Sequence, residues 1–211
     1  SHSCDLSEDL AKLELVVLSH AHNDHFDVQL IHALRDLPIR WVIPEFMLDL
    51  AVERAGLRSD SIIIPSPGNQ FHINGLKLTP FDALHYYGDH GIPEMGYLAE
   101  FDGKRWLFPG DTRQYDCTGL PDVGRLDGVF AHLWLVKGCA LQETLPYLED
   151  FYAFFSHLQP ARLVIAHLQE IGREKEDFWD LHHYALVSRT FQQNHSSIEL
   201  QPALTGKKII L

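Results

Sequence analysis

Short apolar segments alternate along the chain with segments whose apolar residues recur at helical spacing. The strand-like segments are Glu14–Ser19, Arg40–Ile43, Ile62–Ile64, Leu126–Ala131, Arg162–Ala166 and Lys207–Leu211. The helical pattern covers Val28–Asp36, Pro44–Ala55, Glu143–Leu158 and Glu174–Gln193. Asp27 is expected to be the N-cap of the first of these helices, and Gly56 the C-terminal stop of the second. This alternation predicts an α/β fold.

Two tight hairpins are predicted in the middle of the chain. In each, two strand-like segments flank a turn dipeptide: Gln70–Ile73, Asn74-Gly75 and Leu76–Phe81 in the first, and Met95–Phe101, Asp102-Gly103 and Lys104–Phe108 in the second. Asn-Gly and Asp-Gly are the dipeptides that two-residue hairpin turns prefer. No repeat, low-complexity tract or linker interrupts the pattern, so residues 1–211 are expected to form a single domain.

Composition and charge indicate a soluble protein of the cytoplasm. The 211 residues are 45% hydrophobic, enough for one good core, and no apolar run reaches the length of about 18 residues that a membrane span needs. The three cysteines are odd in number and widely spaced, which suits a reducing compartment better than a disulfide framework. A formal charge of −12 argues against a nucleic-acid partner, although bound cations would still attract an anionic small-molecule substrate.

Four possible metal ligands lie within six residues, directly after the first strand-like segment. They are His20, His22, Asp24 and His25. Imidazole and carboxylate groups together suit Zn²⁺ and neighbouring first-row ions, and the short spacing lets one loop direct all four toward one point. A histidine-rich surface turn is the alternative, which the preceding strand and the following helix disfavour. The run therefore predicts a metal site.

Three further donors each follow a predicted strand. They are His85, Asp111 and His167. Each has an ordinary explanation when taken singly, as a loop histidine, a turn aspartate and a helix-capping histidine. Strand ends in open α/β sheets are where binding sites collect, however, so these residues are expected to join the first four. Seven donors are enough for two metal ions.

The donors resemble the motif series of the metallo-β-lactamase superfamily in its hydrolase form. The matching elements, in chain order, are His20-Ala21-His22-Asn23-Asp24-His25, His85, Gly110-Asp111-Thr112 and His167. The resemblance implies a four-layer αβ/βα sandwich with the site at one edge of two facing sheets. The ligands that it implies are His20, His22 and His85 for one divalent ion, Asp24, His25 and His167 for a second, and Asp111 as the bridge between them.

This resemblance also implies a chemistry. Zn²⁺ is expected first at both positions, with Mn²⁺ and Fe²⁺ as alternatives. Two such cations about 3.5–4 Å apart, with a shared water between them, supply a metal-bound hydroxide near neutral pH. Asp24 is the predicted catalytic residue, because a ligand of the second ion can also orient that hydroxide and exchange a proton with it. A purely positioning role beside His20 or His25 is the alternative for Asp24.

The motifs are less specific for a substrate. They look most similar to the group that includes the L-ascorbate 6-phosphate lactonase and N-acyl phosphatidylethanolamine phospholipase D, which cleave different bonds. A small ester-type substrate, either a lactone or a phosphodiester, is therefore expected. Two other functions stay open. One is a non-catalytic member that binds a metal or ligand, and the other is an RNA-processing nuclease, which would be expected to carry a basic arm that this acidic chain lacks.

Four residues are candidates for contacting the substrate. Tyr86 and Tyr87 follow the third predicted ligand, His90 lies with Glu94 in a loop expected over the mouth of the site, and His132 ends a predicted strand. Packing beside the sheet edge is the alternative for the tyrosines. Loops over a site often contact its ligand, which is the reason for including His90, and an ordinary loop histidine is the alternative.

The start of the chain departs from the family pattern. The family usually places a pair of β-hairpin strands before the first histidine motif, and only 19 residues precede His20 here. The first sheet is therefore expected to be short of strands, with Glu14–Ser19 at an open edge. If another subunit covers this edge, the protein is a homo-oligomer. The alternative is that a segment outside this sequence covers the edge.

Overall fold

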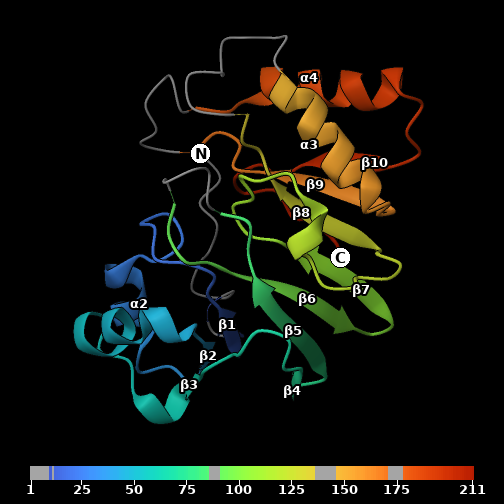
Figure 1. Ribbon diagram of the computed structural model, residues 1–211. Coiled ribbons are helices and arrows are strands. Elements are labelled where there is room, and N and C mark those ends of the chain that lie inside the picture. The colour runs from blue at the N-terminus through green and yellow to red at the C-terminus, as the bar shows by residue number, and fades with distance from the viewer. Residues whose placement is uncertain (1–9, 11, 86–90, 136–145, 171–177) are drawn as a thin grey trace.

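Two facing β-sheets with helices on their outer sides form the protein (Figure 1). The computed structural model describes residues 10, 12–85, 91–135, 146–170 and 178–211. Helix α2 (Val28–Leu34) lies outside the smaller sheet, and helices α3 (Pro146–His157) and α4 (Leu181–Gln193) cover the larger one. This is the four-layer αβ/βα sandwich that the family resemblance implies.

The smaller sheet consists of three parallel strands. In spatial order they are β1 (Leu15–Val17), β2 (Arg40–Val42) and β3 (Ile62–Ile63). Parallel neighbours need a crossover connection, which α2 supplies between β1 and β2. Asp27 caps α2 as predicted, since its carboxylate accepts hydrogen bonds from the backbone N–H groups of Gln29 and Leu30. Strand β1 ends the sheet, so its outer edge pairs with no strand in the described part of the chain.

The connection between β2 and β3 differs from the single α-helix predicted over Pro44–Ala55. A 3₁₀ turn, a π-helical turn and a second 3₁₀ turn occupy this region at Glu45–Met47, Leu50–Arg54 and Ser59–Ser61. Met47, Ala51 and Ala55, which are spaced four residues apart along this segment, are fully buried. Residues at this spacing share one face of a helix, so the predicted apolar face is retained although the turns are irregular. Gly56 ends the segment with φ +72°, as predicted.

The larger sheet has seven strands in the described residues and mixes two pairing modes. The antiparallel strands are β4 (Phe71–Ile73), β5 (Leu76–Asp82), β6 (Met95–Phe101) and β7 (Lys104–Phe108). The parallel strands that continue the sheet from β7 are β8 (Gly128–His132), β9 (Arg162–Ala166) and β10 (Glu199–Pro202). A 3₁₀ turn, Cys117–Gly119, lies between β7 and β8. Both predicted hairpins are confirmed, because each turn dipeptide has positive φ at both positions.

Two predictions near the C-terminus need correction. The last strand is Glu199–Pro202, whereas Lys207–Leu211 is irregular. After α4 the chain returns to the larger sheet and pairs with β9, with Leu200 opposite Leu163. Helix α4 also begins later than Glu174, because Asp180 caps it by accepting hydrogen bonds from backbone N–H groups. Residues 171–177, like residues 143–145 of the other predicted helix, lie outside the described part.

The main core lies between the larger sheet and its two helices. Phe151 and Phe155 of α3 and Phe191 of α4 are buried against Leu163 and Ile165 of β9. A smaller core joins the two sheets, where Val42 contacts the inner face of β5 and β6. These two cores hold the ends of strands from both sheets at one edge of the molecule.

Candidate metal centre

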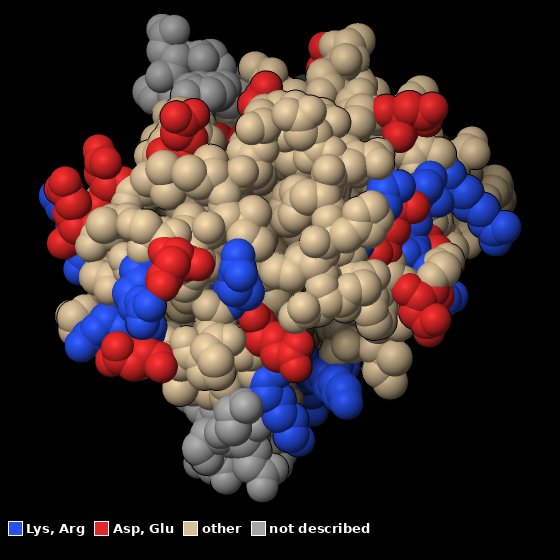
Figure 2. Space-filling model, turned by 90° about the horizontal axis from the view of Figure 1, so that it is seen from below, with Lys and Arg blue, Asp and Glu red and all other residues tan. Residues whose placement is uncertain are grey.

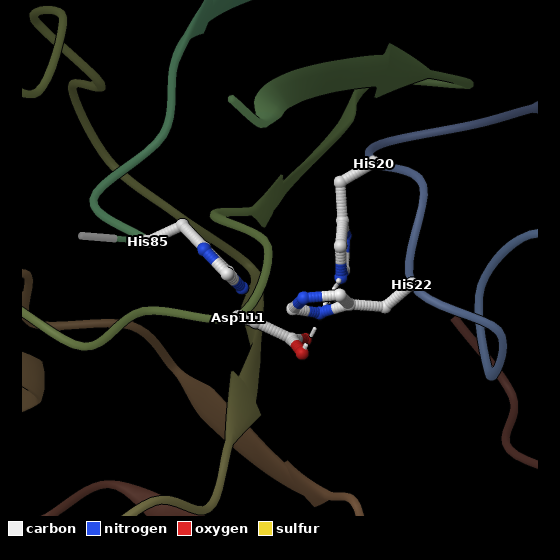
Figure 3. A group of neighbouring side chains, drawn as sticks. All are labelled: His20, His22, His85 and Asp111. Carbon is white, nitrogen blue, oxygen red and sulfur yellow. Dashed lines mark hydrogen bonds and ion pairs between the residues drawn. The ribbon is translucent and has the colours of Figure 1, made fainter. Parts of the chain in front are cut away.

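The seven predicted ligands come together from four separate segments. His20, His22, Asp24 and His25 lie between β1 and α2, and the other three follow β5, β7 and β9. In Figure 3 the side chains of His20, His22 and His85 converge on Asp111 from different parts of the chain. The sequence places these donors at strand ends, and the two-sheet arrangement brings those ends to one place.

One group of donors contains three histidines and an aspartate. His20, His22, His85 and Asp111 each offer one ligand atom, and these atoms lie within 4.8 Å of one another. Nε2 of His20 is 3.0 Å from Nδ1 of His22 and 3.7 Å from Oδ2 of Asp111. Nε2 of His85 is buried without a hydrogen-bond partner. Converging imidazole nitrogens with one left unpartnered fit a divalent ion of the first transition row.

A second group shares the same aspartate. Asp24, His25, Asp111 and His167 again offer ligand atoms within 4.8 Å of one another. Oδ1 of Asp111 lies 3.1 Å from Nε2 of His167 and 3.3 Å from Nε2 of His25. The two carboxylate oxygens of Asp111 therefore face different donor groups. This geometry suits a bridging ligand between two cations.

Burial and charge set the protonation of the histidines. Burial is the main cause that lowers the pKa of His20 to about 4 and that of His85 to about 3. Both imidazoles are therefore neutral near pH 7, which is the form that binds metal ions. Burial also lowers the pKa of His22.

In the second donor group the shifts of the histidines run the other way, and His167 is protonated near pH 7. Burial would lower the pKa of His167, but its hydrogen bonds to Asp111 and Glu170 outweigh burial and raise this pKa to about 10. Asp111 raises the pKa of His25 in the same way. Burial alone would raise the pKa of Asp111, yet the histidines around it, His132 first, hold it far below its usual range. Protons thus sit where a cation would lie, so binding of an ion here would release protons.

Glu94 has a role that the sequence did not reveal. Instead of lying over the mouth of the site, it is buried behind His20, with Oε1 2.7 Å from Nδ1 of His20. The backbone N–H of Asp111 donates to both carboxylate oxygens, at 3.1 and 2.9 Å. One carboxylate thereby contacts a member of each donor group. Burial, reinforced by the charge of Asp111, raises the pKa of Glu94 to about 8.

The position before Asp111 must be glycine because of Glu94. A Cβ atom at Gly110 would lie 2.4 Å from Cδ of Glu94, and Gly110 also has φ +77°. Both the contact and the backbone conformation exclude a side chain. Glu94 therefore favours glycine at position 110, although Glu94 is not part of the Gly110-Asp111-Thr112 motif.

The four predicted substrate contacts have different outcomes. Tyr86, Tyr87 and His90 lie outside the described residues. His132 ends β8 and is buried, with Nε2 4.0 Å from Oδ2 of Asp111. Its ring centroid is 4.2 Å from that of His167. His132 is therefore part of the site, although it belongs to neither donor group.

Two hollows meet the donors from different directions. A polar pocket of about 330 Å³ is lined by Asp24, Asp111 and His132 among others. An apolar groove of about 680 Å³ shares Asp111 and His132 and continues past Tyr97 and Phe130. The polar pocket gives a hydrophilic substrate access to both donor groups, because His22 also lines it.

The αβ/βα sandwich and the two groups of His and Asp donors at one edge of it are typical of one class of metal-binding proteins. Comparisons with known proteins point to the same class. The chain belongs to the metallo-β-lactamase superfamily, since residues 2–175 match the family described as beta-lactamase superfamily domain. It is 25% identical over 118 residues to the Caenorhabditis elegans protein named N-acyl-phosphatidylethanolamine-hydrolyzing phospholipase D 1. That match covers 50% of this chain and 33% of the worm protein, so the chain spans about a third of that relative.

Solved structures show the same fold. The metallo-beta-lactamase fold protein YhfI from Bacillus subtilis is 15% identical with a TM-score of 0.64, and the match covers 94% of this chain and 77% of YhfI. Zn²⁺-bound PqqB from Methylobacterium extorquens is 12% identical with a TM-score of 0.63, and the match covers 99% of this chain and 81% of PqqB. Both likenesses concern the fold.

Proposed function

We propose that this protein is a hydrolase that uses two divalent ions to cleave a small ester-type substrate. The observation that carries the proposal is Asp111, whose two carboxylate oxygens face separate groups of donors. The residues that would hold the ions are His20, His22 and His85 on one side, Asp24, His25 and His167 on the other, and Asp111 between them. When bound, the two cations would lower the pKa of a shared water and polarise the substrate oxygen that gains charge.

Asp24 is the proposed proton-transfer residue. Its side chain is 31% exposed, whereas that of Asp111 is 5% exposed, and it lines the polar pocket. A carboxylate that is open to the pocket can accept a proton from the attacking water and return it to the leaving group. His132 lines the same pocket and is the proposed substrate contact.

A phosphodiester is the first substrate to test, with lactones second. The worm relative is named for a phospholipase D activity, which supports the phosphodiester, although the alignment covers only part of that protein. We also propose that residues 1–211 form one catalytic domain in the cytoplasm. Among the described helices, none is long and apolar enough to cross a membrane.

Surface charge supports a small-molecule substrate over a nucleic acid. The chain has a formal charge of −12. On the face shown in Figure 2, acidic and basic side chains are interleaved around a broad uncharged centre. Binding to a phosphate backbone usually needs a concentrated basic surface, which this face does not present.

Elemental analysis of protein purified without chelators should give two divalent ions per chain. Two ions are expected because the seven nitrogen and oxygen donors divide into two sets. Zn²⁺ is the first expectation for their identity, followed by Mn²⁺ or Fe²⁺. Hydrolysis of bis(4-nitrophenyl) phosphate or of a lactone panel should stop with a chelator and return with the ions.

A value near one ion that does not rise on adding Zn²⁺ or Mn²⁺ would contradict the two-ion centre. Two bound ions without hydrolysis of any panel substrate would instead favour a non-catalytic binding protein. The two measurements therefore separate the metal site from the reaction.

Light scattering at micromolar concentration should show at least a dimer. The edge of β1, which pairs with no strand among the described residues, lies beside the apolar groove, and Val17 lines this groove together with Trp106 and Phe130. A strand from a second copy would satisfy both the unpaired backbone groups and the apolar face. A well-behaved monomer would contradict this proposal.

A further inference from the structure

Arg113 is the only lysine or arginine among the described residues that line the polar pocket. It shares the pocket with Asp24, Asp111 and His132. Sequence reasoning did not identify it, because an arginine that follows Gly110-Asp111-Thr112 has no local pattern of its own. Because Arg113 lies beside both donor groups, its positive charge would act on any molecule that binds in the polar pocket.

Two contacts hold Arg113 in place. Its backbone N–H donates to the carbonyl oxygen of Leu84 at 2.7 Å, so the arginine is tied to the residue that precedes His85. Its Cζ atom lies 5.4 Å from the centre of the Trp134 ring, which also lines the pocket. A guanidinium group held over an aromatic ring is oriented before any ligand arrives.

The guanidinium group forms no ion pair with a carboxylate of the described residues, although Asp24, Asp111 and Glu170 line the same pocket. Nε of Arg113 is buried without a hydrogen-bond partner, and no ion pair within the described ranges includes this residue. A partly buried cation of this kind is costly unless an anion neutralises it.

We propose that Arg113 binds an oxyanion group of the substrate, such as a phosphate, in the polar pocket beside the metal centre. This inference rests on the proposed function, because it assigns the substrate class of the same site. The planar guanidinium can donate to two oxygens of one phosphate or carboxylate, while Trp134 fixes its plane. A substrate without such a group would leave the arginine unpaired, so the pocket selects anionic substrates.

Kinetics with a charged and a neutral substrate test this assignment. The probes are the anionic bis(4-nitrophenyl) phosphate and the neutral 4-nitrophenyl acetate. In Arg113→Gln the ratio of kcat/KM for the anionic probe to that for the neutral probe should fall by about tenfold or more, as expected for loss of a charged hydrogen bond. Arg113→Lys should restore part of the ratio. Arg58→Gln, which changes an exposed arginine paired with Asp60, is the matched control and should leave the ratio unchanged.

Binding of inorganic phosphate tests the site without hydrolysis. Calorimetric titration into metal-depleted protein should show affinity for phosphate that falls by about tenfold in Arg113→Gln. Acetate, run in parallel, distinguishes a phosphate site from a carboxylate site. Arg113→Met keeps the apolar stem over Trp134 and serves as the second neutral variant if the glutamine variant does not fold.

The outcomes separate this inference from the proposed function. An unchanged substrate ratio, or equal phosphate affinity in the parent and both neutral variants, would overturn the role of Arg113. Absence of hydrolysis in every protein, combined with phosphate binding that depends on Arg113, would refute the hydrolase but keep the anion site.

Discussion

Replacing Asp111 with asparagine should lower hydrolysis of the best substrate by at least about a hundredfold while the fold stays intact. Asparagine keeps the shape of the side chain but removes the charge that faces both donor groups, at 3.1 Å from His167 and 3.7 Å from His20. Both proposed ions would therefore lose a ligand in one substitution. The readouts are kcat/KM for bis(4-nitrophenyl) phosphate and for a lactone, metal content, and the thermal unfolding midpoint.

Two further variants sharpen this test. Asp24→Asn should cause a loss of similar size, because it removes the proposed proton-transfer group. Asp116→Asn is the matched control. Asp116 follows β7, as Asp111 does, but it caps an exposed turn at Thr118. Parent activity in both Asp111→Asn and Asp24→Asn would show that the reaction takes place elsewhere.

Glu94→Gln should weaken Zn²⁺ binding by about 10–100-fold, the usual cost of losing a carboxylate that orients a metal-binding histidine. Its carboxylate accepts from Nδ1 of His20 and from the backbone of Asp111, so it holds one member of each donor group. Glutamine keeps one acceptor oxygen but places an NH₂ donor at the other position, where the carboxylate accepts from the backbone N–H of Asp111. Competition with a chromogenic chelator measures the affinity directly.

Glu100→Gln is the control for Glu94. Glu100 lies on β6, a few residues away, and forms partly exposed ion pairs with Lys77 and Arg105. Its loss should leave Zn²⁺ affinity unchanged, because surface pairs contribute little and none of them touches the donors. Equal Zn²⁺ affinity in the parent and in Glu94→Gln would reduce Glu94 to a packing residue.

Local patterns were sufficient for the hairpins, for most strands and for the order of the donors. Asn74-Gly75 and Asp102-Gly103 adopt the positive φ angles that their turns require, and this preference belongs to the dipeptides themselves. The candidate ligands were visible because several lie within one short run and the others follow apolar strands. These signals depend on residues that are neighbours along the chain.

Tertiary structure decided the features that depend on distant partners. Glu94 is one of 29 acidic residues, and only folding places it behind His20. Arg113 gained its proposed role from Trp134 and from the pocket that both residues line. The last strand was assigned wrongly because Lys207–Leu211 has a suitable apolar pattern, whereas the return of α4 brings Glu199–Pro202 against β9. Turn and periodicity preferences act within a few residues, but burial, charge and strand pairing are set by groups that only the folded chain brings together.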